Sequence, residues 1–295
     1  MGKKIVVAGG SGNLGSNLCK HLFAKGGDVH VLVRAGSDTK LIAQRKEIVI
    51  HEVDFQDSKS MVDALNGASC IVSALSGLRE VIIDAQTLLL NAALETHVPR
   101  FIPSDYCIDY RPLKHGTNRN LDLRREFSTI LDGSGIKATS ILNGMFTDLL
   151  NGDAPVILKK QRRIFFWGDP DQKMDFTTLD NTAQFTAEAA LDDSSPRWLS
   201  VAGEEASMRD IAKIAASVYG KEFKFLRPGG LKAFQLMINL TKTFAPAKKE
   251  VFPAWQGMQY LHDMLTGLPK HRQLDNERYP EIEWSSIKSV IAKTK

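Results

Sequence analysis

The sequence predicts an α/β fold with a doubly wound parallel sheet, and three features of its first half predict it. Strand-like apolar runs alternate with helix-like segments from residue 3 to about residue 142. The first run, from Ile5 to Ala8, is apolar at every position, which is typical of a central strand buried on both faces. Such alternation gives parallel strands joined by right-handed crossovers, for which the default strand order is 3-2-1-4-5-6.

Short apolar runs rich in Val and Ile mark the expected strands of this half. They are expected at residues 5–8, 29–33, 48–53, 70–75, 100–102 and 137–142. Helices are expected between them, where apolar residues recur at helical spacing, at 14–22, 61–65, 81–93 and 123–131. Gly26 and Gly67 follow two of these helices, and glycine commonly ends a helix at that point.

The alternation becomes less regular after about residue 150. Residues 164–167 and 173–176 look like two short strands about a turn at 168–171. Helices are expected at 182–191, 208–219, 231–240 and 255–265, and short strands at 198–202 and 223–226. We therefore expect a large domain over residues 1–150 and a smaller mixed α/β C-terminal substrate-binding lobe over 151–295, some segments of which can return to the first domain.

Composition excludes several classes of protein. The net charge of +4 is too small to indicate a nucleic-acid partner, and the basic residues are mostly dispersed. No apolar stretch approaches membrane-spanning length and no signal peptide is visible, so we expect a cytoplasmic protein with no membrane partner. The three cysteines, Cys19, Cys70 and Cys107, lack metal-ligand spacing, which argues against a metal site or a disulfide framework.

Three glycines, Gly9, Gly12 and Gly15, separate the first strand from the first helix at three-residue spacing. Glycine at such points allows a tight turn, close approach of a pyrophosphate, and close packing of helix on sheet. The helix then directs free N–H groups and its positive dipole end at the phosphates. A tight turn without a ligand is the alternative. The strand before and the helix after favour a dinucleotide site, with these expected binding residues: Gly9, Gly10, Ser11, Gly12, Asn13, Leu14 and Gly15.

Arg34 indicates which dinucleotide binds. Enzymes that select NAD usually place Asp or Glu at the end of the second strand, and this chain has Arg34 there. A guanidinium at that point can pair with a 2′-phosphate through a bidentate contact, so the sequence predicts NADP. A surface arginine at the strand end is the alternative. Lys40 can add charge nearby or be a solvated lysine.

Several short segments resemble a known family. They are G-G-S-G-N-L-G at 9–15, V-L-V-R at 31–34, V-D-F-Q-D at 53–57 and P-S-D-Y at 103–106. These segments are similar to those of the atypical short-chain dehydrogenase/reductases, in particular the NmrA-like and isoflavone-reductase-like branch. F-T-T-L-D-N-T-A at 176–183 and L-D-N-E-R-Y-P at 274–280 are similar to bacterial members. The resemblance implies a Rossmann-type NADP-binding domain with a small C-terminal substrate lobe.

The carboxyl ends of the later strands carry the remaining candidate ligand residues, because ligands bind at that edge of open α/β sheets. By the resemblance, Asp54 and Phe55 lie along the adenine edge, although Asp54 can also be a turn residue. Ser104 can bond a ligand or only begin a turn. The further cofactor candidates are Leu75, Ser76, Gly77, Pro103 and Ser104, and the substrate candidates are Asp105, Tyr106, Asn143, Met145 and Phe146. Met145 and Phe146 can equally be core residues.

A Y-x-x-x-K pattern occurs at Tyr110 and Lys114. Most of the wider superfamily uses this pair, at the start of a helix, to protonate the alkoxide that forms during hydride transfer. Here Pro112 lies within the pattern, and the pattern precedes the predicted helix. Because proline breaks the required helix, we interpret the match as a coincidence.

Aligning the chain with the isoflavone-reductase-like enzymes, backward from G-I-K-A-T-S-I-L-N at 135–143 through the preceding helix, gives a different placement for the catalytic residues. The lysine of the isoflavone-reductase-like enzymes then falls at Arg124 and the superfamily tyrosine at Asn120, so both look replaced. Arg124 can hold an anion but cannot release a proton near neutral pH, and a solvated or ion-paired helix residue is its alternative. Asp105, Tyr106 and Tyr110 remain possible acids, although none has decisive spacing. The candidate catalytic residues are therefore Arg124, Asp105 and Tyr106, with Tyr110 left open.

These observations predict an NADP-dependent oxidoreductase that transfers a hydride to a small aromatic or conjugated carbonyl or to a quinone. A quinone relaxes the need for a protein acid, because water readily protonates its reduced oxygens. The alternative is a non-catalytic NADP-binding redox-sensing regulator, as some NmrA-like proteins are. A sugar-nucleotide epimerase is a third option, against which the misplaced Y-x-x-x-K argues. We expect a small-molecule substrate, and a homodimer or a regulatory protein partner stays open.

Overall fold

The computed structural model describes residues 2–43 and 47–293, and all structural statements concern these residues. The chain forms two compact units. The first unit contains Met1–Tyr106, Leu121–Ile141 and Thr182–Leu199. The second unit contains Cys107–Asn120, Leu142–Asn181 and Ser200–Lys295.

A six-stranded parallel sheet forms the centre of the first unit, in the predicted order β3-β2-β1-β4-β5-β6. Its strands are β1 (Lys4–Ala8), β2 (Asp28–Val33), β3 (Val49–Glu52), β4 (Cys70–Ser73), β5 (Arg100–Ile102) and β6 (Lys137–Ala138). In β1, Ile5 pairs with Val29 on one side and with Cys70 on the other. Ile5, Val6 and Val7 are fully buried, as expected for a strand covered on both faces.

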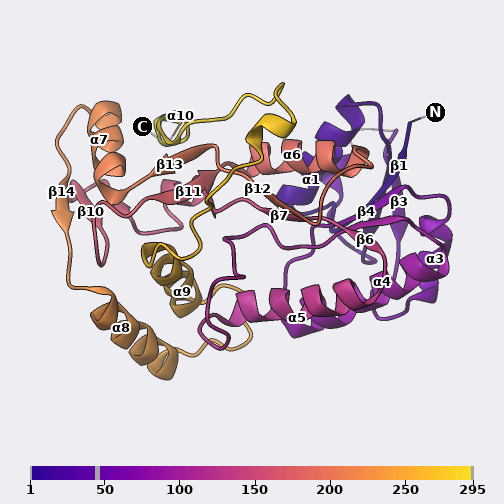
Figure 1. Ribbon diagram of the computed structural model, residues 1–295, viewed down its shortest axis with the longest axis horizontal. Helices are drawn as coiled ribbons and strands as arrows, with labels where there is room; N and C mark the ends of the chain where they lie inside the picture. The colour runs from indigo at the N-terminus through magenta and orange to yellow at the C-terminus, as the bar shows by residue number, and fades with distance from the viewer. Residues whose placement is uncertain (1, 44–46, 294–295) are drawn as a thin grey trace. The chain divides into compact units, whose positions relative to one another are not determined.

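Helices cover both faces of this sheet. They are α1 (Asn13–Ala24), α2 (Lys40–Ala43), α3 (Lys59–Leu65), α4 (Gln86–Glu95), α5 (Arg119–Gly133) and α6 (Leu179–Leu191). In Figure 1, α1 and α6 lie on one side of the strands, and α3, α4 and α5 lie on the other. On that second side Met61, Leu89 and Phe127 join Val6 and Phe101 of the sheet in one apolar cluster. The apolar stripes predicted from helical spacing therefore pack on the sheet.

Two predicted elements of the first half differ in the structure. The helix expected over 81–93 begins as a π-helical segment, Glu80–Ala85, before α4 continues it. The strand expected over 137–142 is divided at Thr139, because Ser140 N donates to Arg197 O (2.8 Å) and so leaves the central sheet. The second half of the run is β7 (Ser140–Leu142), which pairs with β12 (Trp198–Ser200).

The second unit is built from very short strands and several helices. The strands are β8 (Met145–Phe146), β9 (Ile157–Leu158), β10 (Arg163–Phe165), β11 (Met174–Thr177), β13 (Glu204–Ala206) and β14 (Lys224–Leu226). The two strands expected about the turn at 168–171 are β10 and β11, but they belong to different sheets, β14-β10-β9 and β13-β11-β8. Pro170 in that turn instead accepts a hydrogen bond from the N–H of Arg209.

The helices of the second unit are α7 (Met208–Tyr219), α8 (Leu231–Phe244), α9 (Ala254–Leu265) and α10 (Ile287–Ala292). α7 has the predicted bounds and begins with a capping box between Ser207 and Asp210. α8 runs four residues beyond its expected end and stops before Pro246, which cannot continue it. Within the described ranges, every helix is too short or too polar to cross a membrane.

Candidate cofactor and substrate sites

The turn between β1 and α1 depends on close backbone contacts. Gly9 has φ +82°, which favours glycine, and a Cβ there would lie 2.8 Å from the carbonyl oxygen of Ala74. A Cβ on Gly15 would lie 2.3 Å from the carbonyl oxygen of Gly9. On buried Gly10 it would lie 2.4 Å from Cγ1 of Val31. Packing alone therefore requires these three glycines.

Gly12 is different, because packing does not require a glycine there. A Cβ at this position would meet only the carbonyl oxygen of Gly9, at 3.5 Å. Gly12 is the exposed N-cap of α1, with no capping side chain, and the first turn of α1 has no acidic residue. The N–H groups of that turn are thus left for an anion, as a pyrophosphate requires. Asn13 beside it is exposed, and Ser11 and Leu14 are half-buried.

Arg34 directly follows β2 and is exposed. Leu32 pairs with Ala8, so the chain leaves β2 at the same edge of the sheet at which it leaves β1 for the glycine turn. Within residues 2–43 and 47–293, Arg34 contributes a backbone contact, from Ser37 N to its carbonyl oxygen (3.0 Å). Lys40 is 88% exposed and lies 3.8 Å from Asp38. Because Arg34 directly follows β2, the pairing of β2 with β1 fixes its backbone position next to the glycine turn.

The segment after β3 has mainly structural contacts. Asp54 Oδ1 accepts a hydrogen bond from Gln56 N (2.8 Å), and Ser60 Oγ donates to the carbonyl oxygen of Asp54 (2.8 Å). Asp54 therefore has the expected turn contacts, and its place along the adenine edge, which is compatible with them, stays a prediction. Phe55 is buried in the core cluster on the α3 and α4 face.

Ser104 connects the ends of β4 and β5. Its hydroxyl donates to the carbonyl oxygen of Leu75 (2.6 Å), and its N–H donates to Oε1 of Gln86 (3.0 Å). Pro103 before it is buried, Ser76 is exposed, and Gly77 is buried. The buried Gln86 was not predicted. Its signal in the sequence is a single amide within the apolar stripe of the helix over 81–93.

The three catalytic candidates lie together in the first unit. Nε of Arg124 donates to the carbonyl oxygen of Asp105 (2.8 Å), so this arginine holds the backbone just beyond β5. Tyr106 comes next in the chain, with φ +26°, and is buried. Burial raises the pKa of its hydroxyl far above the ordinary value, and Thr186 offsets that rise only in part. Tyr106 therefore remains protonated across the physiological range.

The Y-x-x-x-K residues have unlike environments. Tyr110 is buried, whereas Lys114 is exposed. α5 begins only at Arg119, so neither residue lies on a helix. Asn120, the position aligned with the superfamily tyrosine, is buried and donates through Nδ2 to the carbonyl oxygen of Val251 (2.9 Å). Tyr110 and Lys114 therefore do not form a helical Tyr–Lys pair, and Asn120 makes a structural contact in place of a tyrosine.

The predicted substrate residues of the second unit begin with Asn143, which is fully buried. Its side-chain amide has no hydrogen-bond partner among the described residues, while its carbonyl oxygen accepts from Thr177 Oγ1 (2.7 Å). Met145 and Phe146 form β8 and are half-buried beside β11. An unpartnered buried amide is costly, so Asn143 is the member of this group most suited to a polar ligand.

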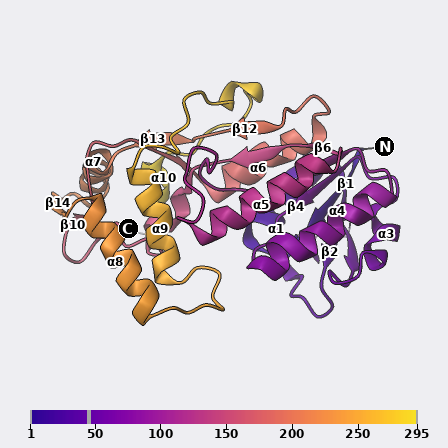
Figure 2. The ribbon, with the colours of Figure 1, turned by 60° about the horizontal axis from the view of Figure 1, so that its bottom comes forward.

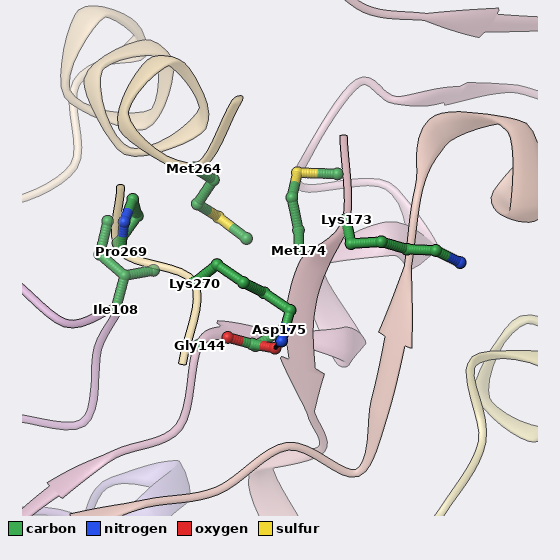
Figure 3. A pocket seen from close by; sticks show the side chains of 8 residues that line it. All are labelled: Ile108, Gly144, Lys173, Met174, Asp175, Met264, Pro269 and Lys270. Atoms are coloured by element: carbon green, nitrogen blue, oxygen red, sulfur yellow. Dashed lines mark ion pairs between the residues drawn. The ribbon is translucent and has the colours of Figure 1, made fainter. Parts of the chain in front are cut away.

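The second unit also contains a small pocket that sequence reasoning missed (Figure 3). Asp175 is buried at its base, 2.9 Å from Nζ of Lys270, and its other oxygen accepts from His271 N (2.8 Å). Lys270 also contacts Glu205 Oε1 (2.6 Å). Burial lowers the pKa of Lys270 while the two carboxylates raise it, and the net direction is upward. Lys270 is therefore a fixed cation rather than a nucleophile.

Apolar side chains complete the wall of this pocket: Ile108, Met174 and Met264. In Figure 3 the amino group of Lys270 reaches Asp175, whereas that of Lys173 points away from the pocket. A carboxylate between Met174 and Phe176 in the apolar strand is the one signal that the sequence offered. Lys270 follows 95 positions later with no local pattern to connect it to Asp175.

A parallel sheet in this order, with an open glycine turn before α1, defines the Rossmann-type class of nucleotide-binding folds. Comparison with known proteins makes the assignment narrower. The profile of the NmrA-like family matches residues 1–252, and the chain belongs to that family.

Individual relatives are distant. Pinoresinol reductase 2 of Arabidopsis thaliana is 28% identical over 212 residues, which are 66% of this chain and 66% of that protein. A solved structure of AtPrR2 with NADP+ and (+)pinoresinol is similar over 100% of this chain and 99% of that one, with TM-score 0.83 and 20% identity. An NADPH-dependent quinone oxidoreductase from Escherichia coli is similar over 99% of this chain and 100% of its own, with TM-score 0.74 and 17% identity.

Proposed function

We propose that this protein is an NADP-dependent oxidoreductase that reduces a small aromatic or conjugated carbonyl or a quinone. The observation that carries the proposal is the open N-terminus of α1 at Gly12, at the sheet edge where Arg34 follows β2. Of the two similar structures named above, one contains NADP+ and (+)pinoresinol, and the other is an NADPH-dependent quinone oxidoreductase. Membership of the NmrA-like family agrees with this assignment.

Each part of the proposed site has a distinct role. The N–H groups of the first turn of α1, at Asn13 and Leu14, hold the pyrophosphate, and Arg34 pairs with the 2′-phosphate. Bound NADPH supplies the hydride. Arg124 fixes the backbone at Asp105 through its 2.8 Å hydrogen bond, and Tyr106 stays a neutral hydroxyl. Because no tuned Tyr–Lys acid stands at the aligned positions, the proposed substrates are those whose reduced form water can protonate.

Turnover assays with NADPH test the proposal directly. Purified protein is mixed with NADPH and with quinones, enones and aromatic aldehydes, and NADPH oxidation is followed. We expect turnover with at least one of these classes. Gly12→Ser should lower it at least tenfold at NADPH concentrations below saturation, because the new hydroxyl caps the N–H groups that the phosphates need. Gly133→Ser, at an exposed position where a Cβ meets nothing within 4 Å, is the matched control and should be active.

A non-catalytic NADP-binding regulator is the second candidate, and two observations favour it. Arg124 is engaged with a backbone carbonyl, and the pKa of Tyr106 is raised out of the range useful to an acid–base group. NADPH that binds with measurable heat but is not consumed with any member of the panel would favour the regulator. If neither NADPH nor NADH binds, both candidates are wrong.

A further inference from the structure

α8 has two apolar faces, and only one of them is packed within the protein. Phe234 and Ile238 are buried, and Phe234 stacks on Trp167 with ring centroids 5.0 Å apart. Figure 2 shows α8 beside α9, with which it packs. Leu236, Leu240 and Phe244 recur every four residues, so they form a stripe turned away from the packed face.

This second stripe is strongly exposed. Leu236 is 60% exposed, Leu240 44% and Phe244 82%, and Phe252 in the connection to α9 is 59% exposed. Met237 at 42% widens the stripe. Single exposed apolar residues are ordinary, but a contiguous row on one helix indicates an interaction surface.

The charge of the same segment is one-sided. Residues 227–253 hold five basic side chains and one acidic one, Glu250, a net charge of +4 that equals the net charge of the whole chain. The rest of the sequence is therefore balanced. The basic residues, all exposed, are Arg227, Lys232, Lys242, Lys248 and Lys249.

We propose that α8 and its connection to α9 form a docking surface for a membrane rich in anionic lipids, which departs from the sequence-based expectation of no membrane partner. A helix with exposed Leu and Phe on one face, in a segment that carries several exposed basic residues, lies in the plane of a lipid interface, where the apolar face enters the headgroup boundary. The lysines are attracted to anionic headgroups. A second copy of the chain is a poorer occupant, because it would bring two surfaces of charge +4 together. A flat bilayer also suits the outward side of a single helix.

Sedimentation of the full-length chain with vesicles tests this surface. Vesicles of phosphatidylcholine alone are compared with vesicles that also contain phosphatidylglycerol, at low and high salt. We expect at least tenfold stronger binding to the anionic vesicles, and weaker binding as salt is raised. The pair Lys248→Gln and Lys249→Gln should weaken binding about 25-fold, since each lysine near such a surface contributes about fivefold.

Matched variants test whether vesicle binding depends on this stripe or on exposed apolar and basic residues anywhere on the protein. The pair Leu240→Gln and Phe244→Gln should also weaken binding at least tenfold, while Leu94→Gln and Lys20→Gln, exposed positions of the first unit, should not. Circular dichroism confirms that each variant is folded. Absent binding, equal binding to both vesicle types, or unchanged binding of the α8 variants would overturn the proposal. A dimer that the Phe244 variant dissociates, without vesicle binding, would assign the surface to a second copy.

Discussion

The first unit is built around one regular parallel sheet covered by helices, whereas the second combines short strands of two small sheets with a buried ion pair between distant segments. In the first, β1 is buried on both faces and Gly15 brings α1 against the backbone of the turn. In the second, the strands have two to four residues, and buried Asp175 is compensated by Lys270 from a distant part of the chain. We therefore expect single substitutions to destabilise the two units for different physical reasons.

The largest effect is expected from Lys270→Met in the second unit. The substitution leaves the carboxylate of Asp175 buried without its cation, which should lower the free energy of unfolding by about 3–5 kcal/mol. Urea denaturation measures this. Adding Asp175→Asn should restore more than half of the loss, since the charge is then gone. Lys173→Met is the control, because its exposed pair with Asp210 should contribute no more than about 1 kcal/mol. Equal losses for both lysines would contradict the account.

Gly15→Ala in the first unit should have the next largest effect. The new Cβ would come within 2.3 Å of the carbonyl oxygen of Gly9, and backbone cannot move aside as a flexible side chain can. We expect a loss of about 1–3 kcal/mol in stability, typical of overpacking, together with loss of nucleotide binding. Thermal unfolding and calorimetry measure the two. Wild-type stability would show that α1 does not pack as closely as the structure describes.

Gly12→Ser should separate binding from stability in the same turn. Serine is a favourable N-cap, so the free energy of unfolding should stay within about 1 kcal/mol of wild type. Its side chain occupies the N–H groups proposed to hold the pyrophosphate, so affinity for NADPH should fall at least tenfold, or about 1.4 kcal/mol. Isothermal titration calorimetry measures this. Unchanged affinity would place the cofactor elsewhere.

The smallest effect is a pH dependence of the first unit. His30 Nδ1 and His51 Nε2 lie 2.8 Å apart, so they cannot both be cations. Burial first, and then the charge of Lys4, lower the pKa of both rings below 6.5. Their contribution to stability is therefore present above pH 6.5, the value for unfolded histidine, and is lost as the pH falls below it.

The expected change is a melting temperature about 2 °C lower on acidification, and His51→Gln should flatten this dependence. His115→Gln, at an exposed histidine of the second unit, should retain the wild-type profile. A melting temperature that rises on acidification would contradict the account, because it would show that the two rings bind protons more tightly in the folded state than in the unfolded state.

The same contrast explains how much the sequence could predict. In the first half, apolar runs and helical stripes report burial directly, so the strand order and the glycine turn were predicted correctly. The division of the predicted sixth strand at Thr139 depends on Arg197, far along the chain, and has no local signal. Likewise, one charged residue in the strand Met174–Thr177 hinted at the pocket, but nothing near Lys270 indicated its partner.

The site residues divide in a similar way. Gly12 and Arg34 could be singled out because the nucleotide fold fixes where each must lie along the chain. The contacts of Ser104 with Leu75 and Gln86 could not, because they depend on how the ends of two strands meet. The raised pKa of Tyr106 could not be predicted either, because it results from burial in the folded unit.

The central claim is that the first unit binds NADP through the α1 turn and Arg34. Calorimetric titration of NADPH and NADH into wild type, Arg34→Ser and the exposed control Lys20→Ser tests it most directly. We expect wild type and the control to prefer NADPH at least tenfold, since a hydrogen bond to a charged group contributes about 1.5–3 kcal/mol. Arg34→Ser should lose most of this preference while its affinity for NADH stays the same. An unchanged preference in Arg34→Ser, or no binding of either nucleotide to wild type, would contradict the claim.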